Sequence, residues 1–360
     1  MEHRLSRRSV IWSAAAAAAS GKFLLAQETP VAPPLPAPAG ATERRPVVSI
    51  VKGDRRRQNV CDALVAIEDQ ILPVLKTKKY VVIKPNIVNT RNQLASTHVD
   101  SLHGILDFLA PRFKGPAVIA ESAAAHTPEG YEHFHYPEAL SEHKPLQVSL
   151  VDLNEEAKFQ TCTILDGNLH AVPVRLAARL LDPEAYIICS AILKTHNTVI
   201  ATLSIKNMAL GAPLHSTRGQ GKWWNDKRLY HGGVRQTHFG ILMTAQRLQP
   251  CWGATVIDGY EGMEGNGPND GTPVPSRVAI ASTDYVAADR VGVEAMGIDP
   301  SWIGYLQFCG QAGLGHVDLA KIDIRGAKPA DVARKYKMHA DIERELRWMG
   351  EMKDVPEKLG

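Results

Sequence analysis

The chain has 360 residues, of which 44% are hydrophobic and 22% are charged, and its formal net charge is +3. This is the composition of an ordinary globular protein, and the length allows one large α/β domain or two smaller ones. A weak and dispersed positive charge does not favour nucleic-acid binding, because surfaces of that kind carry dense clusters of Lys and Arg.

The N-terminal segment has the pattern of an export signal. Arg7 and Arg8 precede the alanine-rich run VIWSAAAAAAS, which is too short to span a membrane. Paired arginines at this place are typical of a twin-arginine signal, and an ordinary secretory signal is the alternative. We therefore expect a signal peptide over residues 1–27, export through the twin-arginine machinery, and a periplasmic or secreted mature protein without a stable membrane span.

The following residues, 28–46, are rich in Pro and Ala and lack a hydrophobic period, so we expect an extended linker there. Beyond it, apolar strand-like runs alternate with helical patterns. Several of these runs are continuous in Val and Ile, which is typical of strands buried on both faces of a parallel sheet. Strands are predicted at 47–51, 80–84, 117–122, 147–152, 185–190, 254–258, 277–282 and 321–326, and helices at 59–75, 98–110, 198–210, 234–248 and 284–297.

This alternation predicts an α/β domain over residues 47–328, with a mostly parallel central sheet and helices on both faces. The polar, glycine-rich stretch 212–233 interrupts the pattern. Loops of that length in compact domains are usually lids or binding loops, so we expect a lid-like loop. Residues 329–360 are charged and have a helical composition, which predicts a helical C-terminal tail.

Several predicted strands end in polar or charged residues. Lys84 and Asp258 are the last residues of two such strands, and Lys194 and His196 follow a third. In open α/β sheets, ligands bind outside the carboxyl ends of the strands. We therefore expect a polar, lysine-rich cleft at this edge; the alternative is that hydrophobic strands simply end in polar residues.

One turn in this set leads to a more specific expectation. We expect the turn 194–197 to open a helix over 198–210 that stops before Gly211, a residue type common just past a helix end. Thr198, Thr202 and Lys206 would follow one another at intervals of four residues on one face, so Lys206 would project along a polar strip of a mostly buried helix. The alternative is a lysine that reaches outward to solvent.

Five motifs occur in a fixed order: VVIKPNIV, STHVD, ILKTHNTVIATLSIKNMALG, IDGYEGMEGNGPNDGTP and STDYVAADRVGVEAMGIDP. As an ordered set, over roughly residues 46–326, they resemble the motifs of the domain-of-unknown-function 362 family. The resemblance implies a fold and a site but no established reaction. It singles out Lys84, Asn86, Thr97, His98, Lys194, His196, Lys206, Asn207, Asp258, Glu264, Gly267, Asp284 and Asp289.

The chemistry of these side chains suggests roles. Lysines can hold a carboxylate or phosphate as point charges, and a buried lysine can act as a base. His196 is a candidate acid and base because the pKa of histidine lies near the working pH, and His231 could be its partner on a closing loop. The expected catalytic residues are Lys194, His196, Lys206 and His231, and the expected substrate-binding residues are Lys84, Asn86, Thr97, His98, Asn207 and Gly267.

The acidic residues form a second expectation. Asp258, Glu261 and Glu264 offer oxygen ligands for a divalent metal, or are solvated carboxylates of a tight glycine-rich loop. Asp284 stands at a predicted helix start, where it can complement the helix dipole. Asp289 lies among apolar residues and is harder to explain in that way. We expect these groups on a carboxylate or metal side of the site.

Other metal-binding patterns are weaker. The five cysteines contain no C-x-x-C, so no cysteine-ligated iron–sulfur cluster and no structural zinc site are expected, although many relatives carry a ferredoxin-like segment. Cys189 and Cys309 lie in apolar runs and are expected to be buried. His133 and His135 form an H-x-H pair, which lacks a third ligand and is expected on a surface loop.

The sequence therefore favours an exported enzyme that acts on a small anionic metabolite by Lys and His acid/base chemistry. Proton abstraction next to a carboxylate, as in an isomerase or lyase, fits these groups. The alternatives are a non-catalytic anion-binding protein and a protein associated with redox chemistry or a metallocofactor. The sequence identifies no cofactor; a divalent metal is one candidate.

Overall fold

The computed structural model describes residues 45–143, 146–217 and 221–351. The expected signal peptide, nearly all of the expected linker and the end of the expected tail lie outside the described residues. The described residues from Arg45 onward belong to one compact unit.

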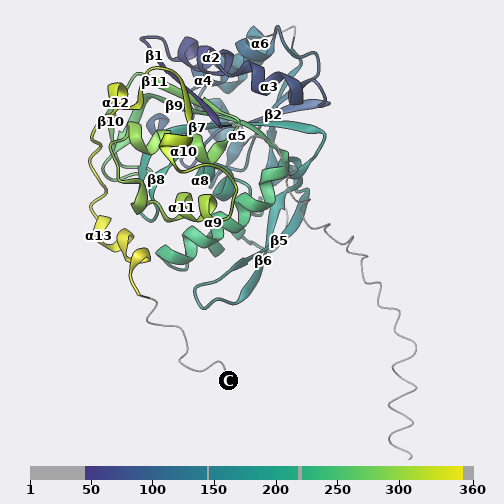
Figure 1. Ribbon diagram of the computed structural model, residues 1–360. Coiled ribbons are helices and arrows are strands. Elements are labelled where there is room, and N and C mark those ends of the chain that lie inside the picture. Colours follow the sequence, from purple (N-terminus) through teal and green to yellow (C-terminus); the bar gives the residue numbers. More distant parts are fainter. Residues whose placement is uncertain (1–44, 144–145, 218–220, 352–360) are drawn as a thin grey trace, which may run out of the picture. The chain divides into compact units, whose positions relative to one another are not determined.

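A ten-stranded sheet lies at the centre of this unit, and its main path has the order β12-β1-β11-β9-β7-β2-β3-β4 (Figure 1). The run from β9 to β4 is parallel throughout, whereas β11 is antiparallel to both of its neighbours. The eight predicted strands are all present, as β1 (Val47–Lys52), β2 (Tyr80–Lys84), β3 (Ala117–Glu121), β4 (Val148–Asp152), β7 (Ala185–His196), β9 (Trp252–Glu264), β11 (Val278–Ser282) and β12 (Asp323–Gly326).

Helices cover both faces of the sheet, as predicted, and each face has its own hydrophobic core (Figure 1). In β2, Val81 and Ile83 belong to one core and Val82 to the other, because successive side chains of a strand point to opposite faces. The first core is covered by α2 (Arg56–Val65), α3 (Glu68–Leu75), α4 (Val99–Leu109), α5 (Thr127–His133) and α6 (Tyr136–Glu142), and the second by α8 (Ser204–Gly211), α9 (Val234–Leu248), α10 (Tyr285–Ala295) and α11 (Gly304–Gln311).

The predicted helix over 198–210 is wrong in its first half. β7 continues through Lys194 and His196, and β8 (Ile200–Thr202) turns back to pair with it. The β-branched run from Thr198 to Thr202 suits a strand better than a helix. Only α8 (Ser204–Gly211) is helical, so the threonines do not share a helical face with Lys206.

The turn of this hairpin is held by the C-terminal segment. Ile200 has a φ of 70°, which is an unusual and strained conformation for a β-branched residue. Its backbone N–H donates to Oε2 of the buried Glu345 at 2.9 Å. Glu345 thus fixes the turn that follows β7.

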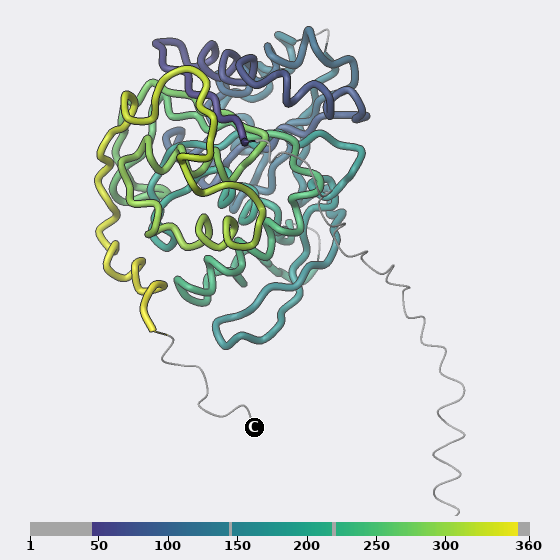
Figure 2. The backbone as a smooth tube through the Cα atoms, viewed as in Figure 1, coloured from purple at the N-terminus to yellow at the C-terminus, as the bar shows by residue number. Residues whose placement is uncertain are grey.

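The C-terminal segment is helical only in part. It contains α12 (Pro329–Val332), α13 (Ile342–Glu345) and a 3-10 turn over Leu346–Met349, and it runs without regular structure between the first two (yellow in Figure 2). Gly265 N donates to the carbonyl of Lys337 at 2.8 Å, so the segment packs against the glycine-rich loop after β9.

The described parts of the predicted lid-like loop, residues 212–217 and 221–233, contain regular structure. His215 and Asn225 form an isolated β-bridge, and a 3-10 helix follows over Asp226–Tyr230. Arg175 anchors Asp226 through paired hydrogen bonds of 2.8 and 2.9 Å. A hairpin that the sequence did not predict, β5 (Phe159–Leu165) with β6 (Ala171–Ala177), supplies this arginine.

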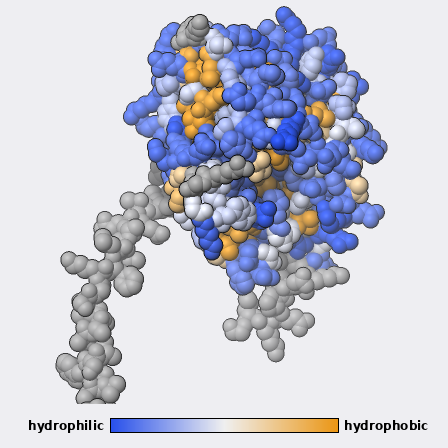
Figure 3. Space-filling model, turned by 180° about the vertical axis from the view of Figure 1, so that it is seen from behind, coloured by the Kyte–Doolittle hydropathy of each residue, from blue (hydrophilic) through white to orange (hydrophobic). Residues whose placement is uncertain are grey.

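One face of the molecule is largely polar (Figure 3). Hydrophilic residues cover most of the face shown in Figure 3, and hydrophobic residues appear there in several separate groups. Within the described part of the chain, no helix combines the length and the hydropathy needed to cross a membrane.

Candidate functional site

Four buried lysines surround the carboxyl ends of β2 and β3. We call Lys84, Lys194, Lys206 and Lys227 the lysine cluster; their exposed fractions are 0%, 0%, 6% and 9%. Burial lowers the pKa values of Lys194, Lys206 and Lys227; the charge of Lys206 lowers those of Lys194 and Lys227 further, and the charge of Lys84 lowers that of Lys206 further. The four amines therefore share one electrostatic environment, with Glu121 as the buried carboxylate paired to it.

Lys84 is fully satisfied within the protein. Its Nζ donates to Glu121 Oε2 at 2.8 Å, to the carbonyl of Pro85 at 2.8 Å and to Asn207 Oδ1 at 3.0 Å. An ammonium group has three protons, so none remains for a ligand. Lys84 therefore acts chiefly as a fixed positive charge and as a support for Asn207.

Gly211 makes room for this amine. A Cβ atom added at Gly211 would lie 2.2 Å from Lys84 Nζ, so any larger residue would displace it. The glycine at the end of α8 is therefore required by close approach to the buried ion pair. The sequence suggested only a role in ending the helix.

Asn86 and Asn207 extend the polar network. Asn207 Oδ1 accepts from Asn86 Nδ2 at 3.0 Å, and its own Nδ2 donates to the carbonyl of Ser190 at 3.3 Å. Asn86 Oδ1 is buried and has no partner among the described residues. An unpaired buried acceptor costs free energy, so a donor on a bound molecule would stabilise it.

Lys194 is held beneath the loop that follows β2. Its Nζ donates to the carbonyl of Ala95 at 2.7 Å and is 3.5 Å from the carbonyl of Pro268. Burial, and then the charge of Lys206, lower the pKa of Lys194 well below its ordinary value. These neutral acceptors stabilise the amine less than a carboxylate would.

Lys206 differs from the other three lysines, because no hydrogen-bond acceptor is found for its amine among the described residues. Burial, and then the charge of Lys84, lower its pKa from 10.5 to about 7. An amine with this pKa exchanges a proton readily at neutral pH. Lys206 is therefore the best placed group of the cluster for reaction with a bound molecule.

His196 has a different role from the one its usual pKa suggests. Its Nδ1 accepts from the backbone N–H of Thr198 at 3.1 Å, so the neutral ring carries its proton on Nε2. Burial, then the charges of Lys206 and Lys194, lower its pKa well below the ordinary value. His196 is consequently a neutral hydrogen-bond donor near Lys206 at physiological pH.

His231 and Lys227 are connected at the end of the long loop. His231 Nδ1 lies 3.0 Å from the carbonyl of Lys227, while Lys227 Nζ donates to Ser122 Oγ at 2.9 Å and to the carbonyl of Leu210 at 3.2 Å. Burial lowers the pKa of Lys227 to about 7, and burial and the charge of Lys206 lower the pKa of His231. His231 thus lies at the outer side of the cluster.

Asp289 positions the helix that presents Lys206. Its Oδ1 accepts from Ser204 N at 2.8 Å and from the Ser204 hydroxyl, and its Oδ2 accepts from Ile205 N at 3.0 Å. A carboxylate at these donors complements the start of α8. Burial raises the pKa of Asp289 to about 7. Asp289 therefore affects the lysine cluster indirectly, by fixing the start of α8, the helix that carries Lys206.

Replacing Asp289 by Ala should lower the free energy of unfolding by about 1–2 kcal/mol, because it leaves the first donors of α8 without an acceptor. Chemical denaturation measures this loss. Asp284→Ala is the matched control, since Asp284 caps α10 in the same way through Val286 N and Ala287 N, both at 2.9 Å. Only Asp289→Ala should also weaken the anion binding that we propose below for the lysine cluster; equal effects of the two variants on binding would contradict this role.

Several residues of the family pattern have structural partners away from the lysine amines. Thr97 Oγ1 accepts from Asn86 N at 2.9 Å and donates to the carbonyl of Ser190 at 2.9 Å, and His98 caps α4 by accepting from Asp100 N at 3.1 Å. These contacts explain both residues without a ligand. Their expected role in substrate binding stays a prediction.

The expected carboxylate side is dispersed. Asp258 lies inside β9 rather than at its end, where Arg56 Nε is 3.2 Å away and the Ser101 hydroxyl donates to it at 2.5 Å. Glu264 Oε2 accepts from Lys337 N at 2.8 Å, and Asp284 caps α10. Among the described residues these carboxylates do not form a three-ligand group.

Gly267 lies against β7. A Cβ atom at this position would be 2.1 Å from the carbonyl oxygen of Thr195, so the glycine allows the loop after β9 to pack directly on the strand. A cavity of about 260 Å³ borders this loop and includes Asn197, Pro268 and His339 in its lining. It lies beside the carbonyl that contacts Lys194. A larger cavity, of about 630 Å³, contains Lys79 and Tyr80 and lies at the opposite ends of the strands.

Sequence reasoning omitted two members of the site. Glu121 ends β3 and is one of the polar strand ends that predict the cleft, but it is not among the residues predicted to bind or react. Lys227 lies in a polar loop, and no local pattern distinguishes a lysine that turns inward from one that faces solvent. Cys189 and Cys309 are buried, as predicted, and all five cysteines are free.

The fold and the site define an α/β protein with a buried cationic cluster at the carboxyl edge of its sheet. The family described as domain of unknown function (DUF362) matches residues 81–294, a range that includes the whole lysine cluster. The chain belongs to this family.

Two further similarities are more distant. A thylakoid-associated protein of Synechocystis sp. is 29% identical over 133 residues, an alignment that covers 36% of this chain and 38% of that protein. A crystal structure of a protein from Thermotoga maritima has a TM-score of 0.41 and 10% identity to this chain, and the match covers 74% of this chain and 61% of that one.

Proposed function

We propose that the protein is an enzyme that binds a small carboxylate or phosphate metabolite at the lysine cluster and uses Lys206 for proton transfer. The observation that supports this most directly is Lys206, a buried residue whose amine has no acceptor among the described residues and a pKa of about 7. Buried cations usually have a partner. A ligand anion would supply it.

The charge balance supports an anionic ligand. Four lysines lie at the cluster, and Glu121 is engaged at short range with only one of them, Lys84, at 2.8 Å. Among the residues that the structure describes, Lys194 has carbonyl acceptors only, and no acceptor is found for Lys206. A bound anion would lower the energy of both amines and raise their pKa values.

Proton abstraction next to a carboxylate fits these groups. In its neutral form Lys206 would accept the proton of a C–H bond, and the electron pair of that bond would move into the adjacent carboxylate to form an enolate. The N–H groups of the Lys194 amine and the Nε2–H of His196 would stabilise the negative charge that develops. Reprotonation at another position would complete an isomerisation, and loss of a leaving group would complete an elimination.

The proposal is tested by calorimetric titration of the full chain with inorganic phosphate and with succinate. We expect saturable binding that Lys206→Met and His196→Gln weaken at least tenfold, since each loss of a charged or buried hydrogen bond costs about 1.5–3 kcal/mol. Lys114→Met, at an exposed lysine, is the control and should bind as the wild type does.

Catalysis is separated from binding by NMR in deuterated water. Exchange of a ligand C–H for deuterium that depends on Lys206 supports an enzyme. Binding without exchange for any bound carboxylate supports the alternative, a non-catalytic anion-binding protein. Binding that is unchanged in Lys206→Met would contradict the site itself.

We also propose that the mature protein is exported by the twin-arginine route and is periplasmic or secreted. Arg7 and Arg8 before the apolar run support this proposal. Replacement of both arginines by Lys should retain the protein in the cytoplasm, as fractionation would show, whereas an ordinary secretory signal would tolerate the change.

A further inference from the structure

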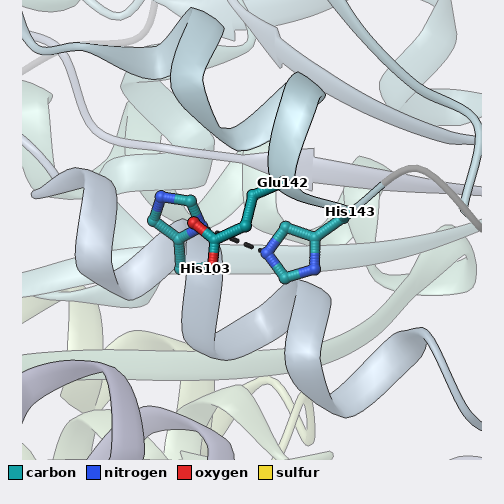
Figure 4. A group of neighbouring side chains, drawn as sticks. All are labelled: His103, Glu142 and His143. Atoms are coloured by element: carbon teal, nitrogen blue, oxygen red, sulfur yellow. Dashed lines mark hydrogen bonds and ion pairs between the residues drawn. The ribbon is translucent and has the colours of Figure 1, made fainter.

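A second group of side chains, outside the lysine cluster, has the composition of a metal site. His103 comes from α4, Glu142 is the last residue of α6, and His143 follows it. Figure 4 shows the three side chains directed toward one another, and their potential ligand atoms all lie within 4.8 Å. Among the described residues, no other group of three His, Cys, Asp or Glu side chains meets this condition.

The distances between these atoms fit a single ion. His103 Nδ1 is 3.1 Å from His143 Nε2 and 3.4 Å from Glu142 Oε2. A tetrahedral ion with bonds of roughly 2.0–2.1 Å holds its ligand atoms about 3.3–3.4 Å apart. These two distances lie close to this value and the third pair of ligand atoms lies within 4.8 Å, so movements of the side chains would place an ion at bonding distance from all three.

The surrounding residues orient the group. Arg57 Nη1 donates to Glu142 Oε1 at 2.5 Å, which leaves Oε2 directed at the histidines. Arg57 also holds Asp107 through contacts of 2.5 and 2.7 Å, and Asp107 Oδ1 lies 3.9 Å from His143 Nδ1. A carboxylate near the second nitrogen of a histidine is the usual outer partner in metal sites, because it fixes the ring and its tautomer.

The exposure of the three side chains also suits a metal site. The side chains of His103 and His143 are 7% and 5% exposed, whereas that of Glu142 is 49% exposed. Two imidazoles are thus fixed inside the protein while the carboxylate faces solvent. An ion held here would keep a fourth position open to water through the side of Glu142.

We propose that His103, Glu142 and His143 bind a first-row divalent cation, with Zn²⁺ as the best fit. Two imidazoles and one carboxylate are ligands that zinc prefers, and the group is compatible with tetrahedral geometry. The site is separate from the lysine cluster, so it stands independently of the proposed activity. The competing explanation is a simple hydrogen bond between the two histidines, with Glu142 held only by Arg57.

The test uses the full chain, stripped with a chelator and titrated with Zn²⁺ by calorimetry and with Co²⁺ by visible absorption. We expect stoichiometric binding, the absorption bands of tetrahedral Co²⁺ and a higher melting temperature with Zn²⁺. His103→Ala and His143→Ala should abolish these signals. His133→Ala, at an exposed histidine, is the matched control and should retain them.

Two further variants allow for the case in which loss of a buried histidine unfolds the protein. Glu142→Gln, at a half-exposed side chain, and Asp107→Asn should both fold, and Asp107→Asn should weaken binding about 10-fold. Absence of saturable Zn²⁺ binding, or binding that persists in Glu142→Gln and in a folded His103→Ala variant, would overturn the proposal.

Discussion

Replacing Glu121 by Gln is expected to lower the free energy of unfolding by about 3–5 kcal/mol at pH 7, because it leaves a buried cation without its counter-charge. Glu121 Oε2 is 2.8 Å from Lys84 Nζ, and the two side chains are 2% and 1% exposed. Glu121 also raises the pKa values of Lys194 and Lys227, so its loss affects the whole lysine cluster. Urea denaturation measures the change.

The control for this prediction is an exposed pair of the same kind. Glu129 Oε1 is 3.0 Å from Arg91 Nη2, with side chains that are 43% and 78% exposed, so Glu129→Gln should change stability by only about 0–1 kcal/mol. The double variant Lys84→Met/Glu121→Gln should be less destabilised than the sum of its single changes, since it removes both buried charges. A similar small effect for Glu121→Gln and Glu129→Gln would show that Glu121 is not the counter-charge of the cluster.

The second large effect is an increase in stability. Lys206→Met should make the protein more stable below pH 7, by up to about 5 kcal/mol, because it removes a buried ammonium that lacks an acceptor. In the folded protein the pKa of Lys206 is about 7 instead of 10.5. Below pH 7 both the folded and the unfolded chains carry the proton, and the folded state bears the full cost of burying it.

The pH dependence follows from the same shift. Between pH 7 and 10.5 the unfolded chain keeps the proton that the folded chain has lost, so the stability of the wild type rises with pH over this range. The free energy of unfolding of Lys206→Met should rise less with pH. The difference between the two curves gives the contribution of Lys206 separately from that of Lys227. Thermal denaturation at several pH values measures both curves.

Lys114→Met, at an exposed position, should leave the pH curve unchanged. A Lys206→Met variant that is less stable than the wild type at pH 6 would mean that an acceptor stabilises the Lys206 amine in the dissolved wild-type protein. That result would remove the main support for the proposed function. Greater stability together with lost anion binding is the usual sign of a residue retained for function at a cost in stability.

The main architecture could be predicted from local patterns. Continuous Val and Ile runs such as those of β2 and β7 are distinctive because both faces of a parallel strand are buried. The rule that polar residues gather at carboxyl ends of strands placed Lys84 near the other lysines. Helical spacing selected Lys206, although only the second half of the predicted helix exists, and the order of motifs added Asn207.

Other features depend on distant contacts and could not be predicted. The end of β7 is fixed by pairing with β8 and by Glu345, more than a hundred residues later in the chain. The inward direction of Lys227 follows from the anchoring of its loop by Arg175, which lies on an unpredicted hairpin. His103 and His143 are separated by forty residues, and only the packing of α4 beside α6 brings them together.

The contact between Glu345 and Ile200 also has a consequence for synthesis. Domains generally fold as their residues leave the ribosome, from the N-terminus onward. The hairpin that follows Lys194 and His196 receives this hydrogen-bond partner only when residue 345 has been made, more than a hundred residues after Lys227. A nascent chain would thus contain every lysine of the cluster and still lack the acceptor that fixes this turn.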